Sequence, residues 1–372
     1  MNTHLISSFN PLVEKISRHS HFIPASRASW SLFALLSLHK KKEKQVIAMP
    51  SFICQSVVAA AALAEWEIKF LDIDCNSGMV HYQNYLSSYA DDVDALLFVH
   101  LLGNQNKLGN LKKFCDQAEI LLIEDSAQFY PPKESLENND DLSHARLISF
   151  GSTKLIDMNQ GGLILSDDKS LLSELTSFQK KFNFKKKLEI KPSLDAFMKS
   201  FYSLKSDLVK NKNIKEGLKK LLPIYTPAIS LEVNYTQDLI SGISDGIMNL
   251  SSEVQLRQLN MAKYEDAFAG SKLIAVSDHC SVPWRASFRI EGLTYKSQHQ
   301  LSEYIRSKGY DVSNWYLPAH WYFDTDDSYD AGLPNTLKLS QEIIQFWVNK
   351  KYDKHHFINL RNLIDKSMDH EK

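Results

Sequence analysis

The chain has 372 residues, of which 44% are hydrophobic, so it is long enough to form one large and one smaller domain. Lys and Arg together number 43 and Asp and Glu 44, and this near balance argues against a large nucleic-acid-binding or membrane-binding surface. Any anionic ligand must therefore be held by a few local groups.

Four cysteines are scattered without CxxC or metal-ligand spacing: Cys54, Cys75, Cys115 and Cys280. Free thiols in a reducing cytosol fit this pattern, and we expect neither a disulfide nor a zinc or other metal site. The N-terminus has no basic segment followed by an apolar block, and the most apolar run, residues 57–64, is too short to cross a bilayer. These features predict a cytoplasmic protein without a membrane anchor.

Apolar runs of strand length recur between residues 46 and 167, among them VIAMPSF, ALLFVHLLG, ILLIED, ARLISFG and GGLILSD. Several are continuously apolar, as in strands that are buried on both faces of a parallel sheet. Segments 51–66 and 107–118 between them favour helices. The pattern predicts an α/β fold with a ligand beyond the carboxyl ends of the strands.

The composition of the chain changes after residue 168. Residues 178–222 carry FQKKFNFKKK and KNKNIKEGLKK, which are basic and helix-prone. We interpret this segment as a solvated helical excursion in preference to a patch that binds an anionic ligand, although it can still flank the cleft.

A second unit begins near residue 249. Its predicted elements are a helix over 251–268, a strand in SVPWRASFRI, a helix over 297–308 closed by Gly309, and a final helix over 335–347. We therefore expect a large domain over residues 1–248 and a small α+β domain over residues 249–372.

Asp125 stands at the end of an apolar strand in ILLIEDSAQ, with Gln128 three residues later. A carboxylate in such a place is costly unless a cation or several hydrogen-bond donors satisfy it, so a protonated ring nitrogen is one partner that fits. A loop or helix-capping Asp that accepts from backbone N–H groups is the alternative, and the residues alone leave both interpretations open.

Lys154 follows the strand of ARLISFGSTK, and the pair 161–162, both glycine, permits a tight entry into the next strand. The lysine is thus placed at the cleft end of the sheet, where desolvation can lower the pKa of its amine, and only the neutral amine attacks an aldehyde. A single lysine after a strand is usually a surface charge. The prediction therefore depends on its combination with Asp125, Gln128, Ser149 and the glycine pair.

Residues 26–29 in PASRASWSLFALL form a small, polar start to an apolar helix. Free backbone N–H groups and the Ser29 hydroxyl can hold a phosphate at such a helix N-terminus. Capping of the helix is a sufficient alternative explanation.

With these three elements in order, the chain resembles the DegT/DnrJ/EryC1/StrS family of sugar aminotransferases that depend on pyridoxal 5'-phosphate (PLP). The most specific part is IEDSAQ followed by SFGSTK and then GG, and further similarity runs from SRASWSLFALL to PNTLKLSQEIIQF. The resemblance implies the fold-type I architecture of aspartate aminotransferases. In that architecture a mostly parallel, seven-stranded sheet lies between helices in the large domain, and a smaller C-terminal α+β domain follows.

The resemblance also implies roles for residues. Lys154 holds PLP as a Schiff base and moves a proton between substrate and cofactor, Asp125 pairs with the pyridinium nitrogen, and Gln128 hydrogen-bonds the ring O3'. The implied cofactor-binding residues are Ala28, Ser29 and Ser149 at the phosphate, then Cys54, Asp125, Gln128 and Lys154, and Asn249 from the neighbouring subunit of a homodimer with shared active sites.

Two positions depart from the family pattern. Cys54 in PSFIC stands where many members carry an aromatic side chain stacked on the cofactor, so stacking is thinner here or comes from elsewhere. The usual SGT at the phosphate helix is SRA at 26–28, which changes the phosphate contacts. His100 and His320 match positions where the family tends to carry histidine. His320 is a candidate substrate-binding residue, and packing with a local hydrogen bond is the alternative for both.

The activity implied is a ping-pong transamination in which an amino acid, expected to be glutamate, loads the cofactor as pyridoxamine phosphate, which then aminates a nucleotide-linked keto-sugar. The setting implied is the biosynthesis of cell-surface polysaccharides or glycoconjugates, with neither nucleic acid nor membrane as a partner. A sugar dehydratase is a second hypothesis, but in those relatives a histidine replaces the lysine. A noncatalytic regulator is a third, and the joint presence of Lys154, Asp125 and Gln128 argues against it.

Overall fold

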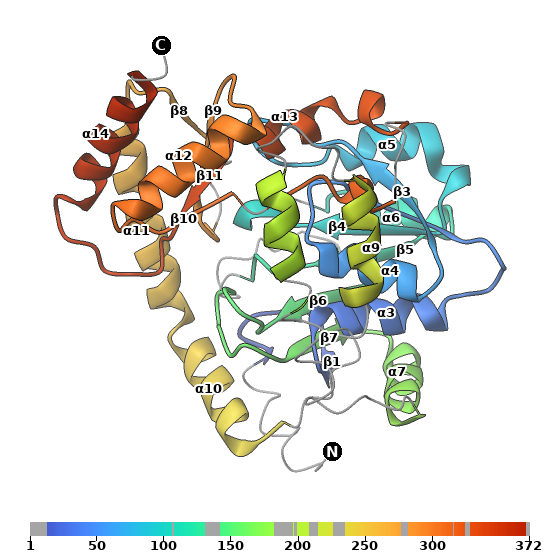
Figure 1. Cartoon of the computed structure of the whole chain (residues 1–372). Helices are drawn as coiled ribbons and strands as arrows, with labels where there is room; N and C mark the ends of the chain where they lie inside the picture. The colour runs from blue at the N-terminus through green and yellow to red at the C-terminus, as the bar shows by residue number, and fades with distance from the viewer. Residues whose placement is uncertain are drawn as a thin grey trace.

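Two sheets organise the molecule, one of seven strands and one of four (Figure 1). The computed structural model describes residues 13–105, 108–130, 142–181, 196, 199–207, 215–225, 235–276, 282–314, 316–323 and 328–369. The larger sheet is formed by strands between residues 21 and 166, and the smaller one by strands between residues 273 and 346.

The large sheet has the order β1-β7-β6-β5-β4-β2-β3. Its strands are β1 (His21–Ala25), β2 (Val46–Pro50), β3 (Glu67–Leu71), β4 (Ala95–Val99), β5 (Leu121–Asp125), β6 (Ala145–Ser149) and β7 (Gly162–Ser166). Strands β3, β2, β4, β5 and β6 pair in parallel, and β7 runs antiparallel to both of its neighbours. Every residue of β4, β5, β6 and β7 is buried, which explains their continuously apolar sequences and confirms the predicted fold class.

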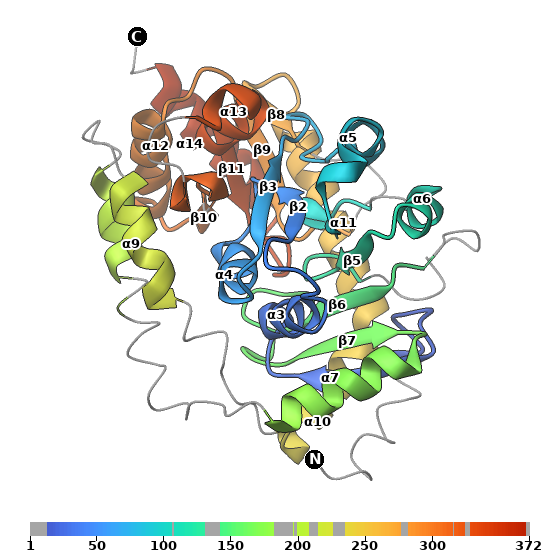
Figure 2. The same cartoon turned by 90° about the vertical axis from the view of Figure 1, so that its right-hand side faces the viewer.

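Helices cover both faces of this sheet (Figure 2). On one face α3 (Ala28–Leu38) packs between α4 (Gln55–Leu63) and α7 (Lys169–Lys181). On the other face α10 (Gln237–Met248) packs against Leu163 and Leu165 of β7. Because side chains alternate along a strand, the residue between these two leucines points to the core under α3 instead.

The small domain is built on the antiparallel sheet β10-β11-β9-β8. Its elements are α11 (Leu250–Phe268), β8 (Leu273–Ala275), β9 (Ala286–Ile290), α12 (Tyr295–Ser307), β10 (Val312–Ser313), α13 (Pro334–Glu342), β11 (Ile343–Phe346) and α14 (His356–Asp369). The predicted helices 251–268 and 297–308 and the strand in SVPWRASFRI are confirmed. Residue 249 lies at the junction of α10 and α11, and the division of the chain into two domains there stays a prediction.

The predicted final helix over 335–347 is wrong in its second half. Helix α13 ends at Glu342, and the next four residues form β11, which pairs with β9. The two isoleucines that open β11 are fully buried in this pairing, so tertiary contact decides their conformation over a local helical pattern. The last helix of the structure is α14, which was not predicted from the sequence.

Two lysines of the basic segment 178–222 are buried rather than solvated. Its described parts include the end of α7, the helical residues 199–207 and α9 (Lys215–Tyr225), which packs against α4. Lys205 is 8% exposed, and Lys215 lies 3.3 Å from the Asp330 carboxylate. The interpretation as a solvated excursion is therefore wrong for these two side chains, because each has polar partners inside the fold.

Candidate active site

A cavity of about 750 Å³ opens at the carboxyl ends of the central strands. Val99, Asp125 and Ser149 are the last residues of β4, β5 and β6, and all three line it. This is the edge of a parallel sheet at which ligands bind, and the edge that the sequence indicated.

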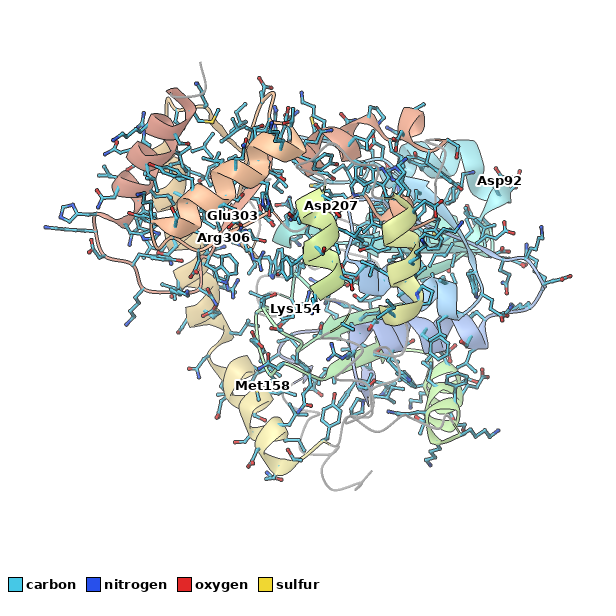
Figure 3. All side chains as sticks on the ribbon, in the orientation of Figure 1. Asp92, Lys154, Met158, Asp207, Glu303 and Arg306 are labelled. Carbon is cyan, nitrogen blue, oxygen red and sulfur yellow. The ribbon has the colours of Figure 1, made fainter. Side chains whose placement is uncertain are left out.

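Two sets of side chains line the cavity, one at the end of the large sheet and one from the helix 199–207 and the C-terminal part of the chain. The set that we call the sheet wall is Asp125, Gln128, Ser149 and Lys154. The set that we call the opposite wall is Lys205, Trp284, Arg285, Tyr316 and Trp347. Figure 3 shows Lys154 at the sheet and Arg306 on α12. Arg306 also lines the cavity.

The turn after β6 fixes the position of Lys154. Thr153 adopts φ +66°, a left-handed conformation that is strained for a β-branched residue. Two hydrogen bonds hold it there: its N–H donates to Asp157 Oδ2 at 2.7 Å, and its carbonyl accepts from Trp284 Nε1 at 2.6 Å. Lys154 Nζ then lies 5.8 Å from the centroid of the Trp284 ring. The small domain thus helps to aim the lysine.

The cavity moves the pKa values of Lys154 and Asp125 toward each other. Burial lowers the pKa of the Lys154 amine, an effect that nearby Cys54 and Asp125 oppose. Burial raises the pKa of Asp125. Two smaller effects lower it: the Ala127 N–H donates to Oδ1 at 2.9 Å, and Lys154 lies nearby. In the described part of the chain this is the only hydrogen bond to the Asp125 carboxylate. A protonated ring nitrogen beside it would supply the missing positive charge.

Gln128 is held at both ends of its amide group. Its Oε1 accepts from the Leu102 N–H at 2.7 Å, and its Nε2 donates to the Tyr316 hydroxyl. The Tyr316 ring packs 4.9 Å from the Phe52 ring, so its hydroxyl is fixed as well. Gln128 therefore presents one orientation to the cavity.

The N-terminus of α3 has the features of a phosphate site. Ala28 and Ser29 line the cavity, and the N-cap residue Arg27 makes no capping hydrogen bond with its side chain. The Ser26 hydroxyl is buried without a partner among the described residues. The first turn of a helix has N–H groups that need acceptors, and an anionic oxygen satisfies them. The residues present thus fit a bound phosphate group.

Gly162 allows the sheet to approach this helix. A Cβ at this position would lie 2.7 Å from the Ile148 carbonyl oxygen and 3.0 Å from the Ala28 nitrogen. The Tyr235 hydroxyl closes the same junction, since it donates to the carbonyls of Gly162 and Ala25 at 2.7 and 2.9 Å. The predicted tight entry into β7 is confirmed. Because Gly162 pairs with Ser149, this entry lets the end of β6 approach the start of α3.

The charged residues of the lining are mostly cations. They are Arg27, Lys154, Lys205, Arg285 and Arg306, against a single carboxylate, Asp125. A chain with balanced total charge therefore gathers basic side chains in one cavity, and its three arginines, Arg27, Arg285 and Arg306, suit a ligand with several anionic groups.

Most of the residues that the sequence implicated meet in this cavity: Ala28, Ser29, Cys54, Asp125, Gln128, Ser149 and Lys154 line it. Asn249 does not. It is exposed at the junction of α10 and α11, where its Nδ2 donates to the Asp245 carbonyl at 2.9 Å. Its contact with a neighbouring subunit stays a prediction.

The two candidate histidines are buried outside the lining. His320 Nδ1 lies 2.7 Å from Ser51 Oγ, and its Nε2 lies 2.7 Å from Asp330 Oδ1. His100 Nε2 lies 2.9 Å from Glu124 Oε1. These contacts fit the interpretation of packing with a local hydrogen bond, so a substrate role for His320 has no direct contact with the cavity to support it.

The sequence does not predict the opposite wall. Trp284 and Arg285 fall in the predicted strand, and Lys205 falls in the segment interpreted as solvated. Tyr316 belongs to no predicted element. No motif of chemical groups marks these residues, because they meet only after the small domain has packed against the sheet. The pair WR at 284–285, a cation beside an aromatic residue, is the one local signal that could have indicated them.

Neither a membrane span nor a metal site is found in the described ranges: no helix there is long and apolar enough, and no group of His, Cys, Asp and Glu could hold a metal. The cysteines within those ranges, Cys54, Cys75 and Cys115, are free thiols.

Known proteins resemble this chain in sequence and in structure. A segment of 108 residues is 30% identical to GDP-4-keto-6-deoxy-D-mannose 3-dehydratase of Escherichia coli O55:H7, covering 28% of this chain and 27% of that enzyme. The chain spans between 27% and 34% of the length of the curated relatives that it matches.

Two solved structures have the same fold. PseC of Helicobacter pylori, an aminotransferase involved in pseudoaminic acid biosynthesis, superposes with a TM-score of 0.74 at 11% identity, over 100% of this chain and 92% of that one. DesI in the presence of its TDP-sugar product superposes with a TM-score of 0.72 at 16% identity, over 100% and 88%. At such identities these likenesses show the fold alone.

The sequence carries the family assignment. The model of the DegT/DnrJ/EryC1/StrS aminotransferase family matches residues 3–189, half of the chain, and this range contains the whole sheet wall. The chain belongs to the DegT/DnrJ/EryC1/StrS aminotransferase family.

Proposed function

We propose that this protein is a PLP-dependent aminotransferase that moves an amino group from an amino acid to a keto group of a nucleotide-linked sugar. One observation carries the proposal: the Lys154 amine and the Asp125 carboxylate share a cavity in which burial disfavours the charge of each. Membership of an aminotransferase family supports the reaction type. Relatives that act on a GDP-sugar or yield a TDP-sugar support the substrate class.

The residues of the sheet wall would divide the work. When bound, PLP supplies a sink for the electron pair of a broken C–H bond. Lys154 would hold the cofactor covalently through Nζ and, once released, would accept and return a proton at that atom. Asp125 would keep the ring nitrogen protonated, and Gln128 would hydrogen-bond the ring oxygen.

The phosphate end would be held by this chain's own backbone and hydroxyl groups. Ala28 and Ser29 at the start of α3 and Ser149 at the end of β6 would bind it, and the unpaired Ser26 hydroxyl lies next to them in sequence. The cationic lining described above would attract a second anion, such as the diphosphate of a nucleotide sugar.

The finer features of the proposal rest on the family resemblance. They are glutamate as the amino donor, a homodimer in which Asn249 reaches the neighbouring site, and a role in cell-surface polysaccharide or glycoconjugate biosynthesis in the cytoplasm. The substrate role of His320 belongs with these, and it would be indirect.

Absorbance and labelling test the cofactor assignment. Protein purified with PLP should be yellow, should lose that absorbance on borohydride reduction, and should then carry the label on Lys154 in a peptide map. A coupled assay with glutamate and a panel of nucleotide keto-sugars should then identify the acceptor. A colourless protein that stays unmodified when PLP is added would exclude the enzyme hypothesis and favour a noncatalytic protein.

A sugar dehydratase is the second candidate, because the curated relative with 30% identity carries that name. In such relatives a histidine replaces the lysine, whereas this chain has Lys154. Product analysis separates the two: an aminotransferase yields an amino sugar and a keto acid in equal amounts, whereas a dehydratase removes a hydroxyl group from the sugar.

A further inference from the structure

Arg285 is a buried cation to which the described residues offer neither a hydrogen-bond acceptor nor a counter-ion. The residue is 8% exposed and lines the cavity. No described residue forms an ion pair with its guanidinium or accepts a hydrogen bond from it, and its Nη1 is buried without an acceptor. An arginine keeps its charge, and a buried charge without a counter-ion is costly, so the arrangement points to an anionic ligand.

Two tryptophans fix the orientation of this guanidinium. Its Cζ lies 4.1 Å from the centroid of the Trp284 ring and 4.1 Å from that of the Trp347 ring. Contact of the cation with a ring face uses no N–H group, so the N–H donors keep their capacity for a ligand. Burial lowers the pKa of Arg285 to about 10, so the group remains positive at neutral pH. The edge of the fork is thus a preorganised donor pair for one planar anion.

Arg285 also lies close to the reacting lysine. Lys154 Nζ and Arg285 Cζ both lie over the Trp284 indole, at 5.8 and 4.1 Å from its centroid, so they are no farther apart than the sum of these distances. Arg285 is among the charges that lower the pKa of Lys154.

The other two cations of this side of the cavity already have partners. Lys205 Nζ donates to the backbone and side-chain oxygens of Asn314, and Arg306 donates to the Val312 carbonyl and to Glu303. Among these three cations, Arg285 therefore has the whole of its hydrogen-bonding capacity available for a ligand.

We propose that Arg285 binds the α-carboxylate of the amino-acid donor, an inference that rests on the proposed aminotransferase function. In an amino acid the carboxylate is attached to the same carbon as the amino group that reacts beside Lys154, so its anchor must lie near that lysine. In a nucleotide sugar the phosphates lie several bonds from the keto carbon, so their anchors lie farther away. The planar edge of a guanidinium also matches a carboxylate by two parallel hydrogen bonds.

The donor half-reaction of the PLP-loaded enzyme tests this role. Loss of the yellow absorbance is followed against the concentration of L-glutamate, L-alanine or 4-aminobutyrate, in the wild type and in Arg285→Gln. Alanine keeps the α-carboxylate but lacks the side-chain one, and 4-aminobutyrate lacks the α-carboxylate. Arg285→Gln should raise the concentration for half-maximal bleaching by about 10- to 100-fold for glutamate and alanine, and by much less for 4-aminobutyrate.

Two matched variants show whether the effect belongs to this guanidinium. Arg285→Lys keeps the charge but loses the planar fork, so it should recover only part of the affinity for glutamate. Arg361→Gln removes an equal charge from α14, outside the cavity lining, and should leave the concentration for half-maximal bleaching unchanged. The affinity of each variant for PLP, measured by titration of the apoprotein, should stay near that of the wild type.

Each remaining outcome overturns the inference. Equal shifts for glutamate and 4-aminobutyrate, a shift for glutamate but none for alanine, or a defect confined to the keto-sugar half-reaction would assign the anion to another source. A fall in PLP affinity would assign Arg285 to the cofactor.

A second readout separates this inference from the proposed function. Succinate should quench the fluorescence of the tryptophans beside Arg285 in the wild type at much lower concentration than in Arg285→Lys. If no amino acid bleaches the wild-type holoenzyme, the proposed transamination fails, whatever succinate does. If amino acids bleach the wild type and Arg285→Gln at the same concentrations, the proposed function stands and the role of Arg285 is wrong.

Discussion

The two walls of the cavity differ in how the chain builds them. The sheet wall comes from one stretch of the sequence, residues 125–154, in which the ends of β5 and β6 and the residues that follow each of them carry every group. The opposite wall is assembled from separate parts of the chain: the helix 199–207, the two residues before β9, the segment after β10, and the residue after β11. In the proposed function the sheet wall supplies the reacting groups, whereas a residue of the opposite wall can be substituted without changing the others. Substrate choice is expected to lie in the opposite wall.

Removal of the lysine should have the largest effect of any single change. Lys154→Ala is expected to lower kcat by about 10⁴-fold or more, because no other amine of the sheet wall can hold the cofactor or move the proton. Steady-state assays of the purified variant measure this. Lys169→Ala, an exposed lysine on α7, is the control and should keep its activity. Wild-type turnover in Lys154→Ala would assign the chemistry to another residue.

Asp125 tests the same wall with a smaller expected effect. Asp125→Asn keeps the shape and the Ala127 N–H bond but removes the negative charge, so kcat is expected to fall by about 10²- to 10³-fold. Absorbance titration should show that PLP still binds. An unchanged kcat would mean that Asp125 only accepts backbone hydrogen bonds, as the alternative interpretation of the sequence held.

Gly162 tests whether the sheet wall needs its close contact with α3. In Gly162→Ala the new Cβ would meet the Ile148 carbonyl, a backbone atom that cannot turn aside. We expect the free energy of unfolding to fall by about 2 kcal/mol or more, together with a loss of PLP affinity. Denaturant unfolding with and without PLP measures both. Gly332→Ala, where a Cβ meets nothing within 4 Å, is the control and should be near neutral.

The difference between the two walls also explains which site residues could be predicted from the sequence. Asp125, Gln128, Ser149 and Lys154 could be predicted because buried parallel strands are continuously apolar and their ends converge at one edge of the sheet. The β11 segment and its neighbour Trp347 could not, since a helical pattern ran on into IIQFW and only pairing with β9 made it a strand. The role of Arg285 depends on two tryptophans 63 residues apart in the sequence, a contact that no local pattern contains.

Lys205 offers a test of the opposite wall through pH. Burial lowers the pKa of this amine to about 7 in the folded protein, below the ordinary value of 10.5. Between these two values the unfolded chain binds the additional proton, so this group makes the free energy of unfolding rise with pH across that window. Lys205→Met should remove about 2 kcal/mol of the rise between pH 7 and pH 9.

Urea unfolding of both proteins at pH 7 and pH 9 measures this difference. The control is Lys199→Met, because Lys199 is an exposed lysine on the same helical segment and its loss should leave the pH dependence unchanged. If Lys205→Met and the wild type gain the same stability over this range, Lys205 keeps an ordinary pKa, and the opposite wall has no titrating lysine there.

Tyr316 links the two walls through its hydrogen bond with Gln128, and removal of its hydroxyl should have the smallest effect of these substitutions. Tyr316→Phe removes the acceptor for Gln128 Nε2 but keeps the ring beside Phe52, so we expect PLP affinity to fall about three- to tenfold. Tyr316→Leu removes the ring as well. If the ring supplies the aromatic surface that Cys54 does not, the leucine variant should lose clearly more affinity in the same absorbance titration. Equal losses in both would limit Tyr316 to orienting Gln128, and the cofactor would then be held without an aromatic contact from this residue.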